Sequence, residues 1–195
     1  MGKSFENVAL FDLDGTLCDY SGGLLKELES MRSPLEKVIT DIPHGDNVPP
    51  YLRARMGYIQ VMAEWWTGLE LLDLGFDIWQ LAKRLSYQRM ILTQGPKRNP
   101  YAWAGKKMWI DKNLGPDTNI TITRDKSLVY GRVLVDDWPP YITNWLKWRP
   151  RGLVIMPVNK FNADFTHNQV IRYDGKNYAE VQERMEAAKY QDKVA

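Results

Sequence analysis

Two aspartates stand two positions apart directly after the first apolar run of the chain. The run Val8-Ala9-Leu10-Phe11 is followed by Asp12-Leu13-Asp14-Gly15-Thr16. In an extended segment, residues two apart point to the same side, so Asp12 and Asp14 are expected side by side. Neighbouring carboxylates repel each other unless a cation or a proton lies between them. The pair therefore indicates either a polar turn at the end of a strand or a site for cation and acid chemistry.

A second pair of acids follows another apolar run. Val133-Leu134-Val135 leads directly into Asp136-Asp137. If both runs are strands of one parallel sheet, their ends meet at the same edge and deliver four carboxylates there. Oxygen ligands with room for water are the set that Mg²⁺ prefers. The two pairs together predict a magnesium site.

Groups that hold anions follow two further runs. Met90-Ile91-Leu92 ends in Thr93-Gln94-Gly95, which offers a hydroxyl and amides, and Lys126 follows the predicted strand 119–123. A cation, an ammonium, a hydroxyl and a nucleophilic carboxylate at one edge are the equipment for phosphoryl transfer.

The elements that must position these residues alternate along the chain. Short apolar runs typical of strands buried on both faces lie at 8–11, 89–93, 119–123, 132–135 and 152–156. Helical periodicity lies at 77–86, 101–114, 140–149 and 178–189. This alternation predicts an α/β fold, with a parallel sheet covered by helices on both faces.

One long stretch after the first strand breaks the alternation. From Tyr51 to Trp66 the pattern predicts a helix with two adjacent stripes of apolar and aromatic residues. Only one such stripe is needed for a helix to pack on a core. We expect residues 18–75 to form a small helical cap inserted after strand 1. Residues 1–17 and 76–195 are then the core.

Composition limits the class of protein. Of 195 residues, 44% are hydrophobic and 26% are charged, which is typical of a folded globular chain. The net charge of +2 argues against a stable nucleic-acid partner, and the single cysteine excludes a disulfide framework. No apolar run reaches the roughly 18 residues of a membrane span. We expect a soluble cytoplasmic protein without a membrane partner, and leave open whether it forms a homodimer.

The motifs together resemble the haloacid dehalogenase (HAD) superfamily. Its DxDGT motif matches Asp12-Leu13-Asp14-Gly15-Thr16 in full, and its later motifs match Thr93, Lys126 and Asp136-Asp137. These matches occur in the family's order, each after an apolar run. The resemblance implies a HAD-like Rossmannoid core and a phosphatase.

Within the superfamily, the sequence is most similar to the 5′(3′)-deoxyribonucleotidase family. The similarity spans roughly residues 7–20 and 88–140 and is loose across the cap. The segments that carry it are Asp19 to Leu24, Tyr101-Ala102-Trp103, Gly115-Pro116-Asp117, Thr123 to Lys126, and Asp136-Asp137. Two positions depart from that family's usual pattern, which has Ser in place of Gln94 and Arg in place of Trp138.

The resemblance also implies roles for the site residues. Asp12 attacks phosphorus and forms an aspartyl phosphate, while Asp14 protonates the leaving oxygen and then activates water. Mg²⁺ is held by the Asp12 side chain, the Asp14 backbone carbonyl and Asp136. Asp137 orders metal-bound water or Lys126. The phosphate-binding residues are Thr93, Gln94 and Lys126.

The substrate depends on the cap. Our first choice is a (deoxy)nucleoside monophosphate, with the aromatic residues Tyr20, Tyr58, Trp65 and Trp66 as a stacking wall for its base. Simple packing within the cap is the competing interpretation of these rings. Two other functions stay open: a phosphatase for another small ester or a nucleic-acid 3′ end, and a non-catalytic nucleic-acid-binding domain.

Overall fold

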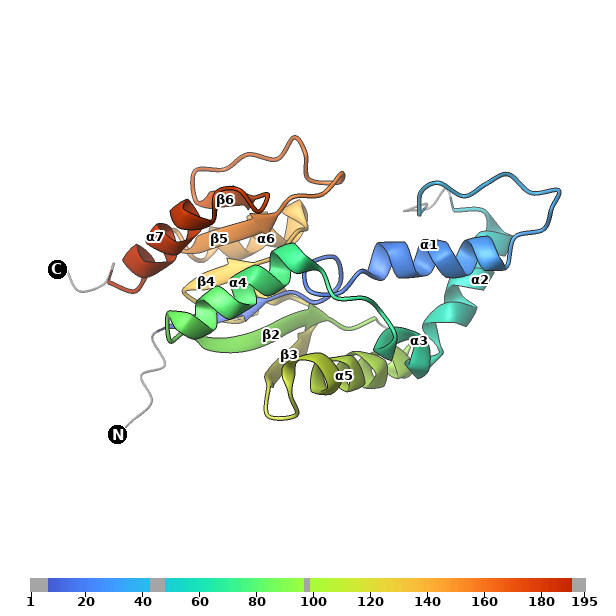
Figure 1. Ribbon diagram of the computed structural model, residues 1–195, viewed down its shortest axis with the longest axis horizontal. Coiled ribbons are helices and arrows are strands. Elements are labelled where there is room, and N and C mark those ends of the chain that lie inside the picture. The colour runs from blue at the N-terminus through green and yellow to red at the C-terminus, as the bar shows by residue number, and fades with distance from the viewer. Residues whose placement is uncertain (1–6, 43–47, 97–98, 191–195) are drawn as a thin grey trace. The chain divides into compact units, whose positions relative to one another are not determined.

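The computed structural model describes residues 7–42, 48–96 and 99–190. In this part of the chain, six parallel strands form one sheet in the order β3-β2-β1-β4-β5-β6 (Figure 1). The strands are β1 Val8–Phe11, β2 Gln88–Gln94, β3 Asn119–Thr123, β4 Val133–Val135, β5 Leu153–Pro157 and β6 Val170–Tyr173. The predicted α/β class with a parallel sheet is confirmed.

Helices connect most of the strands. They are α1 Tyr20–Ser30, α2 Pro50–Gln60, α3 Ala63–Thr67, α4 Asp73–Arg84, α5 Pro100–Leu114, α6 Pro139–Lys147 and α7 Tyr178–Ala188, with a short 3₁₀ helix η1 at Lys126–Leu128. The helices predicted over 77–86, 101–114, 140–149 and 178–189 correspond to α4, α5, α6 and α7.

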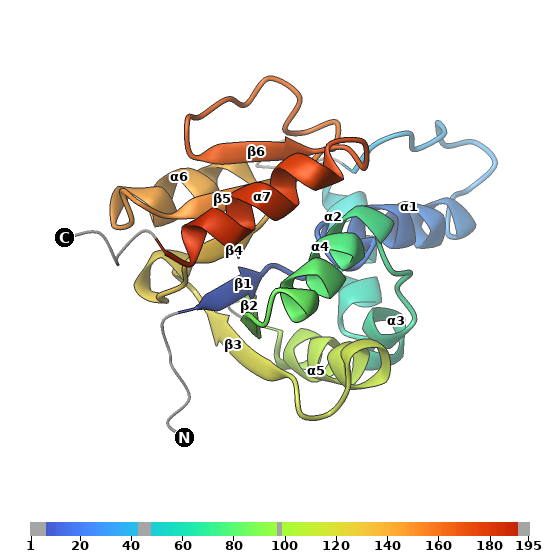
Figure 2. The same cartoon turned by 60° about the vertical axis from the view of Figure 1, so that its left-hand side comes forward.

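Both faces of the sheet are covered. On one face, Leu10, Leu92 and Leu134 pack against Ile142 and Trp145 of α6. On the other face, the Phe11 and Trp79 rings meet edge to face, with centroids 4.9 Å apart, which places α4 against β1. Helix α7 runs on the same side as α4 (Figures 1 and 2). The strand ends are therefore fixed by packing from both sides.

Strand β6 has no counterpart among the strands predicted from the sequence. In this edge strand, Ile171 and Tyr173 are buried while Val170 and Arg172 are half-buried, so the apolar run is not continuous. Alternation of this kind is typical of a strand covered on one face.

The single helix predicted over residues 51–66 is two helices. Helix α2 ends at Gln60 and α3 begins at Ala63. The Gln60 carbonyl accepts hydrogen bonds from the Trp66 indole N–H (2.9 Å) and from the Asn99 side-chain amide (2.7 Å). In a continuous helix, the Gln60 carbonyl would accept a backbone N–H of the next turn. The two side chains bind this carbonyl instead and so stabilise the break between α2 and α3.

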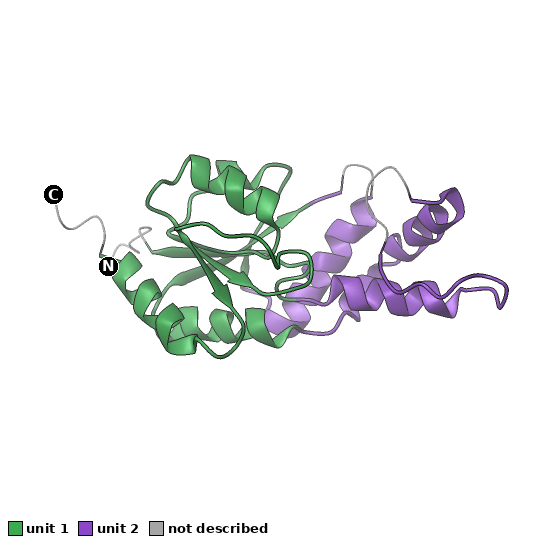
Figure 3. Cartoon of the chain, turned by 90° about the horizontal axis from the view of Figure 1, so that it is seen from above, with its two compact units in different colours: residues 1–17, 72–94, 118–195 green, residues 18–71, 95–117 purple. Residues whose placement is uncertain are grey.

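The chain divides into two compact units (Figure 3). Unit 1 comprises residues 1–17, 72–94 and 118–195 and contains the sheet, while unit 2 comprises residues 18–71 and 95–117 and contains α1, α2, α3 and α5. This division differs from the expected cap of residues 18–75, because α5 groups with the insertion rather than with the sheet.

Close packing between α3 and α5 explains the position of α5 in unit 2. A Cβ atom placed on Gly105 of α5 would lie 2.5 Å from the Trp66 Cβ. The Trp109 indole N–H donates to the Leu69 carbonyl at 2.8 Å. Among the described helices, none is long and apolar enough to cross a membrane.

Candidate active site

Three of the four acids predicted to meet at the edge of the sheet, Asp12, Asp136 and Asp137, lie together at the ends of β1 and β4. Phe11 pairs with Val135 across these strands, so Asp12 and Asp136 follow at the same level. The Asp12 amide donates to the Val135 carbonyl at 2.8 Å. Both carboxylates are buried, and Asp136 is fully inaccessible.

A third acid completes a compact group. Asp12, Asp136 and Asp137 each offer a carboxylate oxygen, and these oxygens lie within 4.8 Å of one another. The predicted metal ligands were Asp12, Asp14 and Asp136, with Asp137 assigned to support them. Asp14 is half-buried in the turn after β1, where the Leu13 carbonyl accepts the amide N–H groups of Thr16 and Leu17.

Lys126 brings a positive charge into this group. Its Nζ lies 2.7 Å from Asp12 Oδ1 and 2.6 Å from Asp136 Oδ2, and the residue is only 3% exposed. Burial lowers the pKa of the ammonium, but the charges of Asp12 and then Asp136 outweigh it, so the pKa lies above its ordinary value. The ammonium is therefore charged and orients the nucleophile candidate Asp12.

Asp137 is held by side chains from two other segments. Its carboxylate accepts hydrogen bonds from the Thr16 hydroxyl (3.0 Å) and from the Asn159 amide (2.7 Å). A Cβ atom on Gly15, whose φ is 81°, would lie 2.7 Å from Asp137 Oδ2. Glycine at position 15 thus provides both the left-handed turn and the space for this carboxylate.

The negative charge of the site exceeds the charge of one lysine. Burial, followed by the charges of Asp12 and Asp136, raises the pKa of Asp137 to about 8. Burial also raises the pKa of Asp136 to about 6, against the opposing charge of Lys126. Asp136 and Asp137 therefore resist ionisation without a cation, and a cluster that offers only carboxylate oxygens is suited to a hard divalent cation.

The predicted phosphate-binding residues lie at the end of the neighbouring strand. Thr93, fully buried, and Gln94 end β2, which pairs with β1. The Gln94 side chain accepts a hydrogen bond from the Tyr141 hydroxyl. The structure therefore brings Lys126 to the acids and places Thr93 and Gln94 on the adjacent strand of unit 1.

Three residues that support the site were not among those predicted from the sequence. Tyr141 of α6 contacts Gln94, and Asn159 contacts Asp137. Asn162 donates to the backbone carbonyls of Asp137 (3.0 Å) and Pro157 (2.9 Å). The sequence feature that could have indicated Asn159 and Asn162 is their position, three residues apart and just after an apolar strand.

In unit 2, three of the four predicted aromatic residues form one cluster. The Tyr20 and Trp66 rings stack with centroids 5.5 Å apart, and Trp65 meets both edge to face, at 5.7 and 4.9 Å. Trp66 is 4% exposed, so packing dominates its environment. Tyr58, on α2, is 62% exposed.

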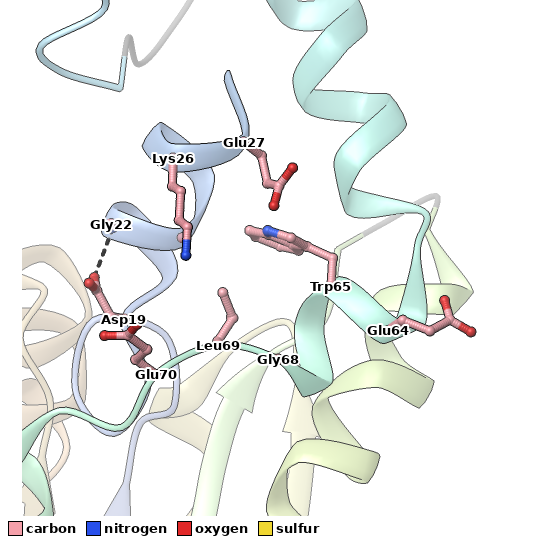
Figure 4. Close-up of a pocket in the computed structure, with 10 residues that line it drawn as sticks. Asp19, Gly22, Lys26, Glu27, Glu64, Trp65, Gly68, Leu69 and Glu70 are labelled. Atoms are coloured by element: carbon pink, nitrogen blue, oxygen red, sulfur yellow. Dashed lines mark hydrogen bonds between the residues drawn. The ribbon is translucent and has the colours of Figure 1, made fainter. Parts of the chain in front are cut away.

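A cavity of about 420 Å³ adjoins this cluster within unit 2. Figure 4 shows Trp65 beside it, with Lys26 and Glu27 of α1 across from the indole ring. The remaining lining residues are Asp19, Gly22, Gly23, Glu64, Gly68, Leu69 and Glu70. Trp65 is thus the tryptophan of the pair with ring surface open to a cavity.

Comparison with known proteins identifies related sequences. The family model described as 5′ nucleotidase, deoxy (Pyrimidine), cytosolic type C protein matches residues 6–191. The mitochondrial 5′(3′)-deoxyribonucleotidase of Mus musculus is 29% identical over 143 residues, which are 67% of this chain and 64% of the relative. The human cytosolic-type 5′(3′)-deoxyribonucleotidase is 26% identical over 138 residues, which are 66% of this chain and 69% of the relative. The matches thus span less than two thirds of the mitochondrial relatives, at 64% for mouse and 61% for human.

Solved structures share the fold. A HAD hydrolase of family IA from Entamoeba histolytica superposes with a TM-score of 0.53 at 14% identity, covering 94% of this chain and 99% of the other. A haloacid dehalogenase-like hydrolase from Burkholderia xenovorans gives a TM-score of 0.51 at 16% identity, covering 93% and 97%. At these identities the likeness concerns the fold, and it agrees with the HAD-like core predicted from the motifs.

Proposed function

This chain belongs to the family of 5′ nucleotidase, deoxy (Pyrimidine), cytosolic type C proteins, and from that membership we propose that it hydrolyses phosphomonoesters. The observation that carries the proposal is the contact of Lys126 Nζ with both Asp12 and Asp136, at 2.7 and 2.6 Å. This contact holds the carboxylate nucleophile Asp12 and the anion-binding ammonium of Lys126 together, as phosphoryl transfer requires.

The reaction proceeds in two displacements. An Asp12 carboxylate oxygen attacks phosphorus, the ester P–O bond breaks, and Asp14 gives its proton to the leaving oxygen. Water then attacks phosphorus of the aspartyl phosphate, the bond between phosphorus and the Asp12 oxygen breaks, Asp14 accepts a proton from that water, and inorganic phosphate leaves with the Asp12 carboxylate restored. Lys126 and Thr93 hold phosphate oxygens through both steps.

The acid cluster is suited to Mg²⁺. Asp12 and Asp136 would hold the ion together with the Asp14 backbone carbonyl, and Asp137 would order its water. When bound, the ion screens the negative charge between the phosphate and the attacking carboxylate. Asp137, hydrogen-bonded to Thr16 and Asn159, keeps a fixed place beside these ligands.

We propose deoxyribonucleoside monophosphates as the substrates. The matching relatives are named 5′(3′)-deoxyribonucleotidases. Trp65, which lines the cavity in unit 2, offers aromatic surface of the kind on which a base stacks, with a gain of roughly 1–3 kcal/mol per base.

A panel of phosphate esters tests the proposal. It should include 5′- and 3′-deoxyribonucleoside and ribonucleoside monophosphates, sugar phosphates, glycerol phosphate and p-nitrophenyl phosphate, each with Mg²⁺, with Zn²⁺ or with a chelator. We expect nucleoside monophosphates to be preferred, Mg²⁺ to be required, and Zn²⁺ to support turnover poorly because the donors are all oxygens. Equal turnover of sugar phosphates would refute the nucleotidase proposal, and full activity with the chelator would refute the metal requirement.

A further inference from the structure

Tyr141 connects α6 to two of the predicted phosphate-binding residues. It lies in the first turn of α6, four residues after Asp137. Its hydroxyl donates to the side-chain oxygen of Gln94, and its ring centroid lies 4.6 Å from Lys126 Nζ. One side chain therefore touches groups that come from β2 and from η1.

The ring of Tyr141 is a third neighbour of the Lys126 ammonium. Two carboxylates, Asp12 and Asp136, already bind this group at 2.7 and 2.6 Å. An ammonium 4.6 Å from a ring centroid is within the range of cation–π attraction, which strengthens in a desolvated site. The ring thus adds to the contacts that determine where the buried charge lies.

The hydroxyl of Tyr141 contributes to how the Gln94 amide is turned. The backbone of Gln94 is fixed by its pairing with Thr123 of β3, so the orientation of its side chain depends on contacts such as this one. A primary amide has an oxygen that accepts and an NH₂ group that donates. Because Tyr141 donates to the oxygen, the NH₂ group is on the opposite branch of the amide. A phosphate dianion accepts hydrogen bonds, so it is attracted by the NH₂ group and repelled by the oxygen.

We propose that Tyr141 is a positioning residue of the phosphate site, which turns the Gln94 amide so that its NH₂ group donates to a phosphate oxygen and holds Lys126 through its ring. The identification of the anion as a substrate phosphate rests on the proposed function. The positioning role itself concerns any phosphate, including the inorganic product.

Binding of inorganic phosphate in the presence of Mg²⁺, measured by calorimetry, tests this role without turnover. Tyr141→Phe keeps the ring and removes the hydroxyl, and it should weaken phosphate binding roughly 3- to 10-fold. Tyr141→Leu, which also removes the ring, should weaken it further. Tyr130→Phe, a tyrosine of the same unit that is 54% exposed, is the matched control and should bind phosphate like the unmodified protein.

A double-mutant cycle with Gln94→Ala identifies the path of the effect. If Tyr141 acts through Gln94, Tyr141→Phe should cost less than about twofold in the Gln94→Ala background. For an ester that is turned over, Tyr141→Phe should raise KM more than it lowers kcat. Thermal unfolding of each variant shows whether the fold is retained.

Unchanged phosphate affinity in Tyr141→Phe would overturn the positioning role, as would the absence of phosphate binding in the unmodified protein. An undiminished effect in the Gln94→Ala background would overturn the path through Gln94, and equal affinities for the Phe and Leu variants would overturn the role of the ring. Phosphate binding with the expected cycle but without hydrolysis of any ester would support the inference and refute the proposed function.

Discussion

At the scale of single residues, Asp12 is the acid for which catalysis and stability make opposite demands. Burial, and after it the charge of Asp12, raises the pKa of both Asp136 and Asp137, although Lys126 binds Asp12 at 2.7 Å. We expect Asp12→Asn to lower phosphate release by about 10³-fold or more, because an amide cannot form the covalent intermediate. The same change should leave the metal-free melting temperature unchanged or raise it, because it relieves carboxylate repulsion.

A phosphate-release assay and thermal unfolding in EDTA check both parts of this prediction. Asp164→Asn, which removes an exposed carboxylate of the same unit, is the control and should alter neither quantity. Near-normal turnover in Asp12→Asn would rule out the covalent mechanism.

The pKa of Asp137 predicts an unusual dependence of stability on pH. Burial and neighbouring acids raise this pKa to about 8, from an ordinary value of 3.8, so the folded state favours the protonated carboxyl. This contribution is fully present below about pH 4 and is lost as the pH rises towards 8. The raised pKa of Asp136, about 6, acts in the same direction.

We therefore expect the free energy of unfolding in EDTA, measured with urea, to fall between pH 5 and pH 8. The fall should be smaller in Asp137→Asn, which removes the titrating group. A metal-free stability that increases across this range in the unmodified protein would contradict the prediction.

At the scale of elements, the contact between α3 and α5 depends on a glycine. A Cβ atom on Gly105 would lie 2.5 Å from Trp66 Cβ, and Trp66 is buried. We expect Gly105→Ala to destabilise the protein by about 1–3 kcal/mol, because the helices must move apart. Gly57→Ala on α2 is the matched control, since a Cβ atom there would have no neighbour within 4 Å.

The two glycine variants should differ in sign. Alanine has the higher helix propensity, so Gly57→Ala should stabilise the protein by up to about 1 kcal/mol. Urea unfolding measures both changes. Equal effects of the two substitutions would mean that α3 and α5 do not pack as closely as described.

At the scale of the whole molecule, the acids belong to unit 1 and the aromatic cluster to unit 2. We expect Trp65→Ala to lower kcat/KM for a deoxyribonucleoside monophosphate by about tenfold, through the loss of base stacking. Turnover of p-nitrophenyl phosphate should change by less than about twofold, because its small leaving group does not need that surface. Trp66→Ala is less informative, because removing a buried tryptophan costs about 3–5 kcal/mol of stability.

Steady-state kinetics with both esters measure this selectivity. Tyr51→Ala removes an exposed aromatic side chain of the same unit and is the control. A parallel fall for both esters in Trp65→Ala would indicate that this indole packs the unit and does not select the substrate.

The sequence by itself determined the core of the sheet and the residues at its edge. Four of the strands contain a continuous apolar run, β3 alternates polar and apolar residues, and the acids, Thr93 and Lys126 follow these segments within a few residues. The runs and the motif residues beside them are local features of the sequence. The runs reflect burial of strands inside a covered sheet, and in a parallel sheet the ends of such strands meet at one edge. The same local motifs carried the resemblance to deoxyribonucleotidases, which the family match over residues 6–191 confirms.

Only the tertiary structure decided which distant residues support the site and how the helices group. Tyr141 contacts Gln94, which is 47 positions away in the chain, and Asn159 contacts Asp137, which is 22 positions away. Neither contact produces a periodic pattern in the sequence. Likewise, α5 has an ordinary helical sequence, and its place in unit 2 depends on the fit of Gly105 against Trp66. Hydrogen bonds and close packing of this kind depend on positions in space, whereas apolar periodicity depends only on the exposure of each element.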